Sequence, residues 1–182
     1  MSSLYLFSGP CGSGKSTLAD QFANRLVEDG RSLQVYVIHG DDFHKGFVET
    51  ARRLGPDHPG FLYWPDILAF IWERMLASAE AALRRGLDVI MDYVVEDELA
   101  MVKELAEKYG ATLYYIVLTA PEDILRQRLQ RRGDPQLVER SLFLKAKLEQ
   151  LTENKNHLLD TSKASPQQLA AELDIQRYHL PL

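Results

Sequence analysis

A glycine-rich run near the N-terminus combines the residue types that bind phosphate. Residues 9–16 match the pattern G-x-x-x-x-G-K-[ST] at every position, and Thr17 follows directly. Glycines permit backbone angles that turn successive N–H groups towards one anion, and a following helix N-terminus adds partial positive charge. Lys15 would reach the β- and γ-phosphates of ATP, and the Ser16 hydroxyl would ligate Mg²⁺. The nucleotide-binding residues are therefore predicted to be Gly9, Pro10, Cys11, Gly12, Ser13, Gly14, Lys15, Ser16 and Thr17.

The segments on either side of this run supply the context that the motif requires. Residues 4–7 are apolar and are predicted to form a short buried strand. Behind the run, Leu18, Phe22 and Leu26 recur at helical spacing until Gly30 ends the helix. A strand, a glycine loop and a helix in that order favour a phosphate site over the alternative, a glycine-rich turn that binds nothing.

Carboxylates follow the second and third predicted strands. Asp41 and Asp42 come just after the second strand, and Asp92 follows the third. The carboxyl ends of parallel strands meet at one edge of a sheet, so we expect these side chains beside the phosphate loop. A carboxylate there can hold Mg²⁺ or accept a proton from an attacking hydroxyl, which makes Ser16, Asp41 and Asp92 the candidate metal ligands. The alternatives are that one member of the pair caps a helix or turn, or that a buried Asp92 only orders the loop.

A group of arginines lies in the segment 126–140, which we interpret as a lid. Its members are Arg126, Arg128, Arg131, Arg132 and Arg140. Residues three and four apart share a helix face, so Arg128 lies with Arg131 and Arg132. Arginines on a closing segment neutralise the charge that phosphoryl transfer spreads over the γ-oxygens, so Arg128 and Arg132 are catalytic candidates. The alternative is a solvated helix face.

Strand-like and helix-like segments alternate along the chain. Further strands are predicted at 33–38, 87–91, 112–118 and 157–159. Helices are predicted from Pro65 to Gly86 and from 99 to 110, and three more begin at Pro121, Pro135 and Ser165-Pro166. The pattern predicts an α/β fold, a P-loop NTPase with a parallel sheet of about five strands and helices on both faces. No linker or repeat divides residues 1–182, so one domain is expected.

Composition narrows the class of protein. The chain has 182 residues, of which 46% are apolar, enough for a sizeable single core. A net charge of −5 offers no overall attraction to nucleic acid. No apolar run approaches the ~20 residues needed to span a bilayer, and no signal peptide is evident. A single cysteine fits a reducing compartment, so we expect a cytoplasmic protein without nucleic-acid or membrane partners.

The segment 42–66 is expected to form the acceptor pocket, because it lies between the acidic pair and the next helix. Between residues 44 and 64 the positive side chains exceed the negative ones, with Lys45, Arg52, Arg53, His44 and His58 against Glu49 and Asp57. That balance suits an anionic acceptor. The aromatic residues Phe43, Phe47, Phe61, Tyr63 and Trp64 can stack on a base or sugar face, although such residues are more often core. His58 is interpreted as a loop residue, since no second His or Cys accompanies it at ligand spacing.

These motifs together resemble those of small P-loop kinases of the gluconate kinase and shikimate kinase type, over roughly residues 3–174. Gluconate kinases follow their second strand with Gly-Asp and then a His three residues after the Asp. They also carry Arg-x-x-x-Arg at the lid and a later Leu-Glu. The matching residues here are Gly40-Asp41, His44, Arg128, Arg132 and Leu148-Glu149.

The resemblance implies roles for several residues. Lys15 and Ser16 would bind ATP and Mg²⁺, Asp41 would be the catalytic base, and Arg132 would be the lid arginine. The implied reaction moves the γ-phosphoryl group of ATP to a hydroxyl of a small molecule, and a sugar acid is one implied acceptor class.

The chain departs from gluconate kinases at the acceptor side, which leaves alternatives open. Lys45-Gly46-Phe47 stands where those enzymes have Pro and a nearby Asn. Met91-Asp92-Tyr93 resembles a wider set of P-loop kinases that includes antibiotic-phosphorylating and zeta-toxin-like enzymes. Asp41-Asp42-Phe43 resembles the Asp-Asp-Phe of uridine kinases, so a nucleoside or nucleotide kinase is the alternative. A non-enzymatic ATP-binding switch is a further hypothesis, but the acidic pair and basic lid favour the kinase.

Overall fold

The computed structural model describes residues 2–47 and 55–182. Its centre is a five-stranded sheet in the order β2-β3-β1-β4-β5, and every pair of neighbouring strands is parallel. The strands are β1 (Ser3–Ser8), β2 (Val35–His39), β3 (Asp88–Asp92), β4 (Thr112–Thr119) and β5 (Leu158–Asp160). The predicted α/β fold with a parallel sheet of five strands is confirmed.

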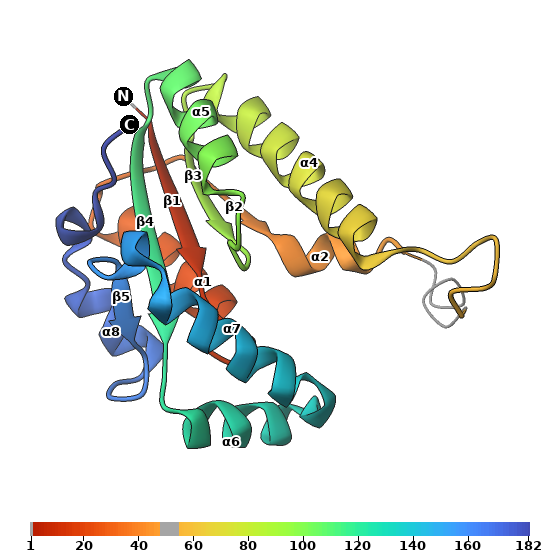
Figure 1. Ribbon diagram of the computed structural model, residues 1–182. Coiled ribbons are helices and arrows are strands. Elements are labelled where there is room, and N and C mark those ends of the chain that lie inside the picture. The colour runs from red at the N-terminus through yellow and green to blue at the C-terminus, as the bar shows by residue number, and fades with distance from the viewer. Residues whose placement is uncertain (1, 48–54) are drawn as a thin grey trace.

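Helices cover both faces of the sheet (Figure 1). Successive residues of a strand point to opposite faces, and β1 feeds two separate apolar clusters in this way. Leu4 and Leu6 pack in one cluster with α4 (Trp64–Leu83) and α5 (Leu99–Tyr109). Tyr5 and Phe7 pack in the other, with α1 (Lys15–Glu28) and α8 (Pro166–Glu172). A central strand buried on both faces explains the nearly continuous apolar run in its sequence.

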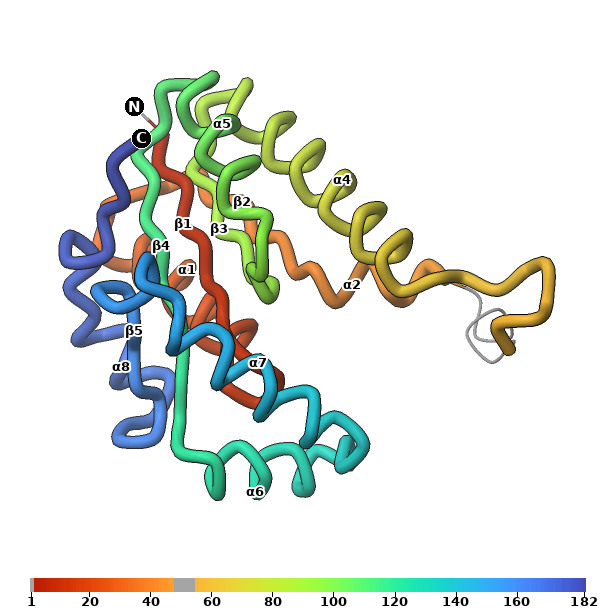
Figure 2. The backbone as a smooth tube through the Cα atoms, viewed as in Figure 1, coloured from red at the N-terminus to blue at the C-terminus, as the bar shows by residue number. Residues whose placement is uncertain are grey.

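Three helices gather beyond the carboxyl ends of the strands (Figures 1 and 2). They are α2 (Gly40–His44), α6 (Glu122–Arg132) and α7 (Val138–Gln150). The 3₁₀ turns are η1 (Pro135–Leu137), η2 (Thr152–Asn154) and η3 (Ile175–Tyr178). Residues 55–63 form an extended segment that lies away from the sheet and leads into the start of α4 (Figure 2). Ligand sites in open parallel sheets lie at this carboxyl edge.

Strand boundaries differ from the predicted ones by one or two residues, in a consistent direction. β2, β3 and β5 each begin and end later than predicted and run on to a polar last residue: His39, Asp92 and Asp160. The apolar Leu33, predicted to open β2, lies outside the strand and is largely exposed. The sheet includes the polar ends of β2 and β3, where His39 and Asp92 are register partners. Among the described helices, none is long and apolar enough to cross a bilayer.

Candidate active site

A cavity of about 740 Å³ opens at the carboxyl edge of the sheet. Its walls include most of the phosphate loop together with residues from α2, α4, α6 and α7. All four predicted catalytic residues line it: Lys15, Asp41, Arg128 and Arg132. The fold therefore brings these four side chains, which are far apart in sequence, to the same cavity.

The phosphate loop adopts the backbone geometry that its glycines permit. Gly9, Gly12 and Gly14 have φ of 142°, 78° and 94°, and α1 begins directly after Gly14. At Gly9 a Cβ atom would lie 2.5 Å from the carbonyl oxygen of Leu118 on β4. A side chain there is excluded both by the backbone angle and by the neighbouring strand. The Lys15 ammonium donates to the carbonyl of Pro10 at 3.1 Å, so it lies over the loop.

Ser16 and Asp92 meet beneath the loop. The Ser16 hydroxyl donates to Asp92 Oδ2 at 2.6 Å, and Asp92 is only 3% exposed. The two side chains offer a hydroxyl and a carboxylate, the oxygen donors that Mg²⁺ takes alongside nucleotide phosphates and water. In the described part of the chain, no group of three or more His, Cys, Asp or Glu could hold a metal alone. Ser16 and Asp92 therefore fit a magnesium site in which the phosphates of a bound nucleotide would supply the remaining ligands.

His39 is a site residue to which the sequence analysis gave no role. Its Nδ1 hydrogen-bonds Asp92 Oδ1, and its Nε2 lies 3.2 Å from Asp20 Oδ1 on α1. The hydrogen bond to Asp92, with the charges of both carboxylates, raises the His39 pKa to about 9 despite its partial burial. No sequence motif marks His39, because its contact with Asp92 follows from the register of two neighbouring parallel strands, which only the structure shows.

Arg128 and Arg132 occupy different positions, although both line the cavity. The Arg128 guanidinium donates to the carbonyl of Gly12 at 3.3 Å and to the carbonyl of Thr161 at 2.7 Å. Burial lowers the pKa of Arg128 from its ordinary value. Arg132 is more exposed and pairs with Asp134 at 2.5 Å. Arg128 thus clamps the loop, whereas the Arg132 side chain pairs with a partly exposed carboxylate. Their catalytic roles stay predictions.

Two hydroxyl groups that the sequence analysis did not single out fasten the phosphate loop to its surroundings. The buried Ser141 on α7 donates to the carbonyl of Cys11 at 2.7 Å. The Thr161 hydroxyl donates to the carbonyl of Ser13 at 2.8 Å and accepts from Arg128. No motif marks either residue, because their role depends on contacts across more than a hundred positions of sequence.

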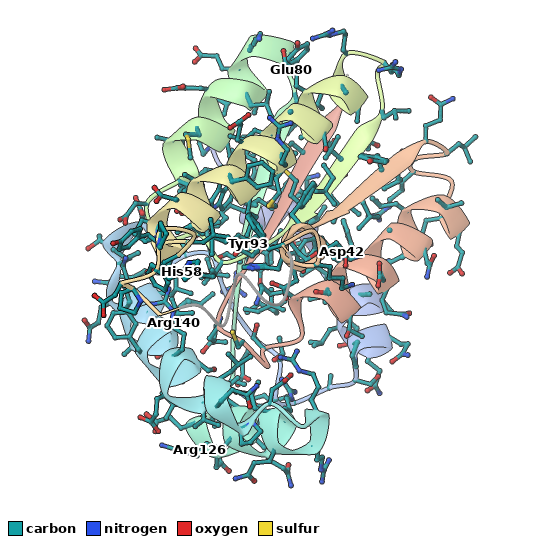
Figure 3. All side chains as sticks on the ribbon, turned by 90° about the vertical axis from the view of Figure 1, so that its right-hand side faces the viewer. Asp42, His58, Glu80, Tyr93, Arg126 and Arg140 are labelled. Carbon is teal, nitrogen blue, oxygen red and sulfur yellow. The ribbon has the colours of Figure 1, made fainter. Side chains whose placement is uncertain are left out.

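The other predicted arginines lie at the rim or outside the cavity. Arg140 lines the cavity wall and pairs with Glu96, while Arg126 reaches Glu139 at 3.6 Å on the outer side of α6 (Figure 3). Arg131 is exposed in the last turn of α6.

The acidic pair splits into two environments. Asp41 lines the cavity. Burial of the Tyr93 side chain is the main reason why the Tyr93 pKa is raised, and the negative charge of Asp41 is the second. Asp42 instead pairs with Lys45 at 2.5 Å on the exposed side of α2, and that hydrogen bond lowers the Asp42 pKa. Both residues lie in the first turn of α2, where carboxylates are favoured by the helix dipole. Only Asp41 faces the volume that contains Lys15.

Aromatic rings line the part of the cavity that the sequence analysis assigned to the acceptor. Trp64 stacks on His44 with ring centroids 5.5 Å apart and planes 13° apart, and His44 Nε2 lies 2.7 Å from the Tyr93 hydroxyl. Trp64 is 47% exposed and so is not a core residue. Figure 3 places Tyr93 at the centre of this region. Gly40 is required here because a Cβ would lie 2.3 Å from Tyr93 Cδ2.

The remaining acceptor-side predictions fall in different places. Glu49, Arg52 and Arg53 lie outside the described residues. His58 accepts a hydrogen bond from the Gly60 amide at 3.0 Å within an exposed turn, in keeping with a loop residue. Glu149 accepts from the Thr119 hydroxyl at 2.5 Å and from Lys145 at 2.6 Å, so it ties α7 to the end of β4.

Comparisons with known proteins match most of the chain. A family model described as an AAA domain matches residues 4–158. The ribose 1,5-bisphosphate phosphokinase PhnN of Pectobacterium parmentieri is 38% identical over 139 residues, which are 73% of this chain and 70% of that protein. The guanylate kinase of Geobacter metallireducens is 24% identical over 137 residues, 71% of this chain, and the match spans 65% of the length of that relative.

Solved structures share the fold over nearly the whole chain. The Deinococcus radiodurans tunicamycin resistance protein has a TM-score of 0.65 and 22% identity, and the match covers 97% of this chain and 95% of that one. The Mycobacterium tuberculosis APS kinase CysC, solved with AMPPNP and APS, has a TM-score of 0.61 and 22% identity, with 94% of each chain covered. These likenesses establish a P-loop NTPase fold.

Proposed function

Because the chain belongs to the AAA domain family and has the P-loop NTPase fold, we propose that it is a kinase that transfers the γ-phosphoryl group of ATP to a small molecule. Relatives named as kinases support this proposal. The acceptor group that we propose is a hydroxyl.

The observation that carries the proposal is the common cavity of Lys15, Asp41 and the phosphate loop, with the Ser16–Asp92 contact at its base. The loop amides and Lys15 would hold the β- and γ-phosphates, and Ser16 and Asp92 would hold Mg²⁺. A bound magnesium ion would neutralise phosphate charge. Asp41 faces the same volume and would orient the acceptor hydroxyl and take its proton. Positioning and electrostatic stabilisation then account for most of the catalysis.

Arg132 is the arginine that we propose to act on the transferring group. Its exposed pairing with Asp134 can be exchanged for a phosphoryl oxygen at little cost, since such surface pairs contribute about 0–1 kcal/mol. Arg128 makes four hydrogen bonds to the phosphate loop and Thr161. Moving it towards substrate would break that set, so we assign Arg128 to loop rigidity and ATP binding.

The acceptor side combines aromatic faces with cationic groups. Trp64 and His44 present stacked rings, and Arg132 and Arg140 line the same cavity. This chemistry suits a small anionic acceptor with a sugar ring, such as a sugar acid. A nucleoside or nucleotide acceptor is the second candidate, because the half-exposed Trp64 offers a face on which a base would stack.

The direct test is ATP-dependent phosphorylation of a panel of sugar acids, phosphorylated sugars, nucleosides, nucleoside monophosphates and hydroxyl-bearing antibiotics. Phosphorus NMR of the products separates a new phosphate ester from a new phosphoanhydride, and so identifies the acceptor group. A Ser16→Ala, Asp92→Asn double variant is the matched control, because both residues lie away from the acceptor side. An ester formed by the wild type alone supports the proposal. An anhydride product contradicts the hydroxyl acceptor, and ATP binding without any product across the panel favours the switch.

A further inference from the structure

A chain of hydrogen bonds and ion pairs runs from Ser16, just after the phosphate loop, to Asp20. Ser16 and Asp20 are four residues apart on α1, so their side chains share one face of the helix. Across from them, His39 and Asp92 are register partners at the ends of β2 and β3. Ser16 binds Asp92 at 2.6 Å, Asp20 lies 3.2 Å from His39, and His39 binds Asp92. Four side chains from three elements therefore form one continuous chain.

We propose that His39 is a positioning residue that fixes the Asp92 carboxylate for the metal ion, and that Asp20 in turn orients His39. This inference rests on the nucleotide and metal site of the proposed function and adds to it a role for two residues outside the cavity lining.

The geometry explains why Asp92 needs such a partner. A carboxylate can rotate about its terminal bond, and the Ser16 hydroxyl holds only Oδ2. The imidazole holds Oδ1, so both oxygens are fixed and the group presents one orientation towards Ser16. Asp92 is almost fully buried, and a buried carboxylate with one partner missing is strongly disfavoured. Removing the imidazole would therefore change both the orientation of Asp92 and the alignment of the Ser16 hydroxyl.

Asp20 completes the arrangement from the helix side. A histidine ring with one nitrogen bound can still tilt, whereas a ring held at both nitrogens has a defined plane. The Asp20 side chain is more than half exposed, so its contact contributes less than the buried one. The inference therefore ranks the two residues: the loss of His39 should affect the site more than the loss of Asp20.

The test compares ATP affinity with and without Mg²⁺, measured by calorimetry on the full chain, for the wild type and three variants. His39→Leu removes the donor while keeping similar bulk, and we expect Mg·ATP affinity to fall about tenfold, as is typical when an outer partner of a metal ligand is lost. ATP affinity in EDTA should stay within about twofold, because the phosphate loop is untouched. His39→Asn keeps an N–H donor near the position of Nδ1 and should restore most of the Mg·ATP affinity. Asp20→Ala should show a smaller loss of the same sign.

Several results would overturn the inference. One is unchanged Mg·ATP affinity in His39→Leu, and another is an equal loss with and without Mg²⁺, which would indicate a merely structural role. Equal behaviour of the Asn and Leu variants would also contradict it. If His39→Leu does not fold, Asp20→Ala decides instead, and an unchanged Mg·ATP affinity in that variant contradicts the proposal. A wild type that binds no ATP in either condition would instead refute the proposed function, and with it this inference.

Discussion

The Ser16 hydroxyl donates to Asp92 Oδ2 at 2.6 Å, across 76 positions of sequence. This contact joins the start of α1 to the end of β3 and makes the phosphate loop and the buried carboxylate one unit. The hydroxyl hydrogen is used in the bond, so the oxygen lone pairs of Ser16 remain for a cation. The arrangement is compatible with both interpretations that the sequence left open for Asp92, because the carboxylate contacts the first turn of α1, and we propose that it also holds Mg²⁺.

Lys15→Ala should abolish high-affinity ATP binding and turnover while leaving the thermal midpoint nearly unchanged. Lys15 contacts only the Pro10 carbonyl among the hydrogen bonds described, so its loss removes phosphate binding and not core packing. Calorimetric titration with Mg·ATP and a thermal melt measure the two effects. Lys155→Ala, a change at an exposed lysine just after η2, is the matched control. Wild-type affinity and turnover in Lys15→Ala would contradict the nucleotide site.

Local sequence patterns were sufficient to predict the sheet, the order of the elements and the phosphate loop. The motif is continuous in sequence, and the apolar runs of β1 and β4 are dictated by burial on both faces. Residues whose role depends on distant contacts were not predictable in this way. Ser141 and Thr161 have no motif of their own, and His39 acts only through a register partner that the sequence does not reveal.

The environment of Asp41 and Asp42 illustrates the same limit. A pair of adjacent carboxylates in the first turn of a helix looks symmetrical in sequence. The helix turns by about 100° per residue, so the two side chains must point in different directions. One reaches the cavity and the other reaches Lys45.

Cys11 should be protected from thiol reagents by nucleotide. It lines the cavity within the phosphate loop, and its own carbonyl accepts from Ser141, so the backbone at this position is held. A bound phosphate would cover it, and labelling should slow by at least about tenfold at saturating Mg·ATP, which corresponds to a 1.4 kcal/mol change in access. Mass spectrometry of the labelled chain measures the rate. Adenosine serves as the control ligand without phosphates, and equal labelling rates in all conditions would contradict the position of Cys11 under the nucleotide.

Trp64 should report acceptor binding by its fluorescence. The chain has two tryptophans, of which Trp64 is 47% exposed at the cavity and Trp72 is 1% exposed in the core. In a Trp72→Phe variant, a true acceptor should change the emission saturably, because it would displace water from the exposed indole face. The complementary Trp64→Phe variant keeps only the buried tryptophan and should give no response. A response of equal size in both variants would place the acceptor elsewhere.

Glu80→Gln should destabilise the chain at neutral pH but not in acid. Glu80 on α4 accepts from Lys108 at 2.8 Å and Tyr109 at 2.7 Å on α5, and these hydrogen bonds lower its pKa to about 2. A depressed carboxyl pKa contributes stability above the ordinary value of about 4.5, and this is lost as pH falls towards 2. Urea unfolding of wild type and variant at pH 7 and pH 3 tests this, with Glu73→Gln on the same helix as control. If the difference in unfolding free energy between wild type and variant did not shrink in acid, or persisted at high salt, the stabilisation by Glu80 would not come from its ion pair.

Asp41→Asn should remove acceptor phosphorylation while leaving ATP affinity within a few-fold. Asp41 lines the cavity with Lys15, and loss of a general base typically lowers the rate by about 10²–10⁴. Asp42→Asn is the matched control, because Asp42 carries the same charge in the same helical turn but pairs with Lys45 outside the cavity. Single-turnover transfer rates and Mg·ATP affinities of both variants separate the possible roles. If Asp41→Asn instead abolishes Mg²⁺-dependent ATP binding, the carboxylate is chiefly a metal ligand. Unaltered transfer in both variants would exclude the acidic pair from the mechanism.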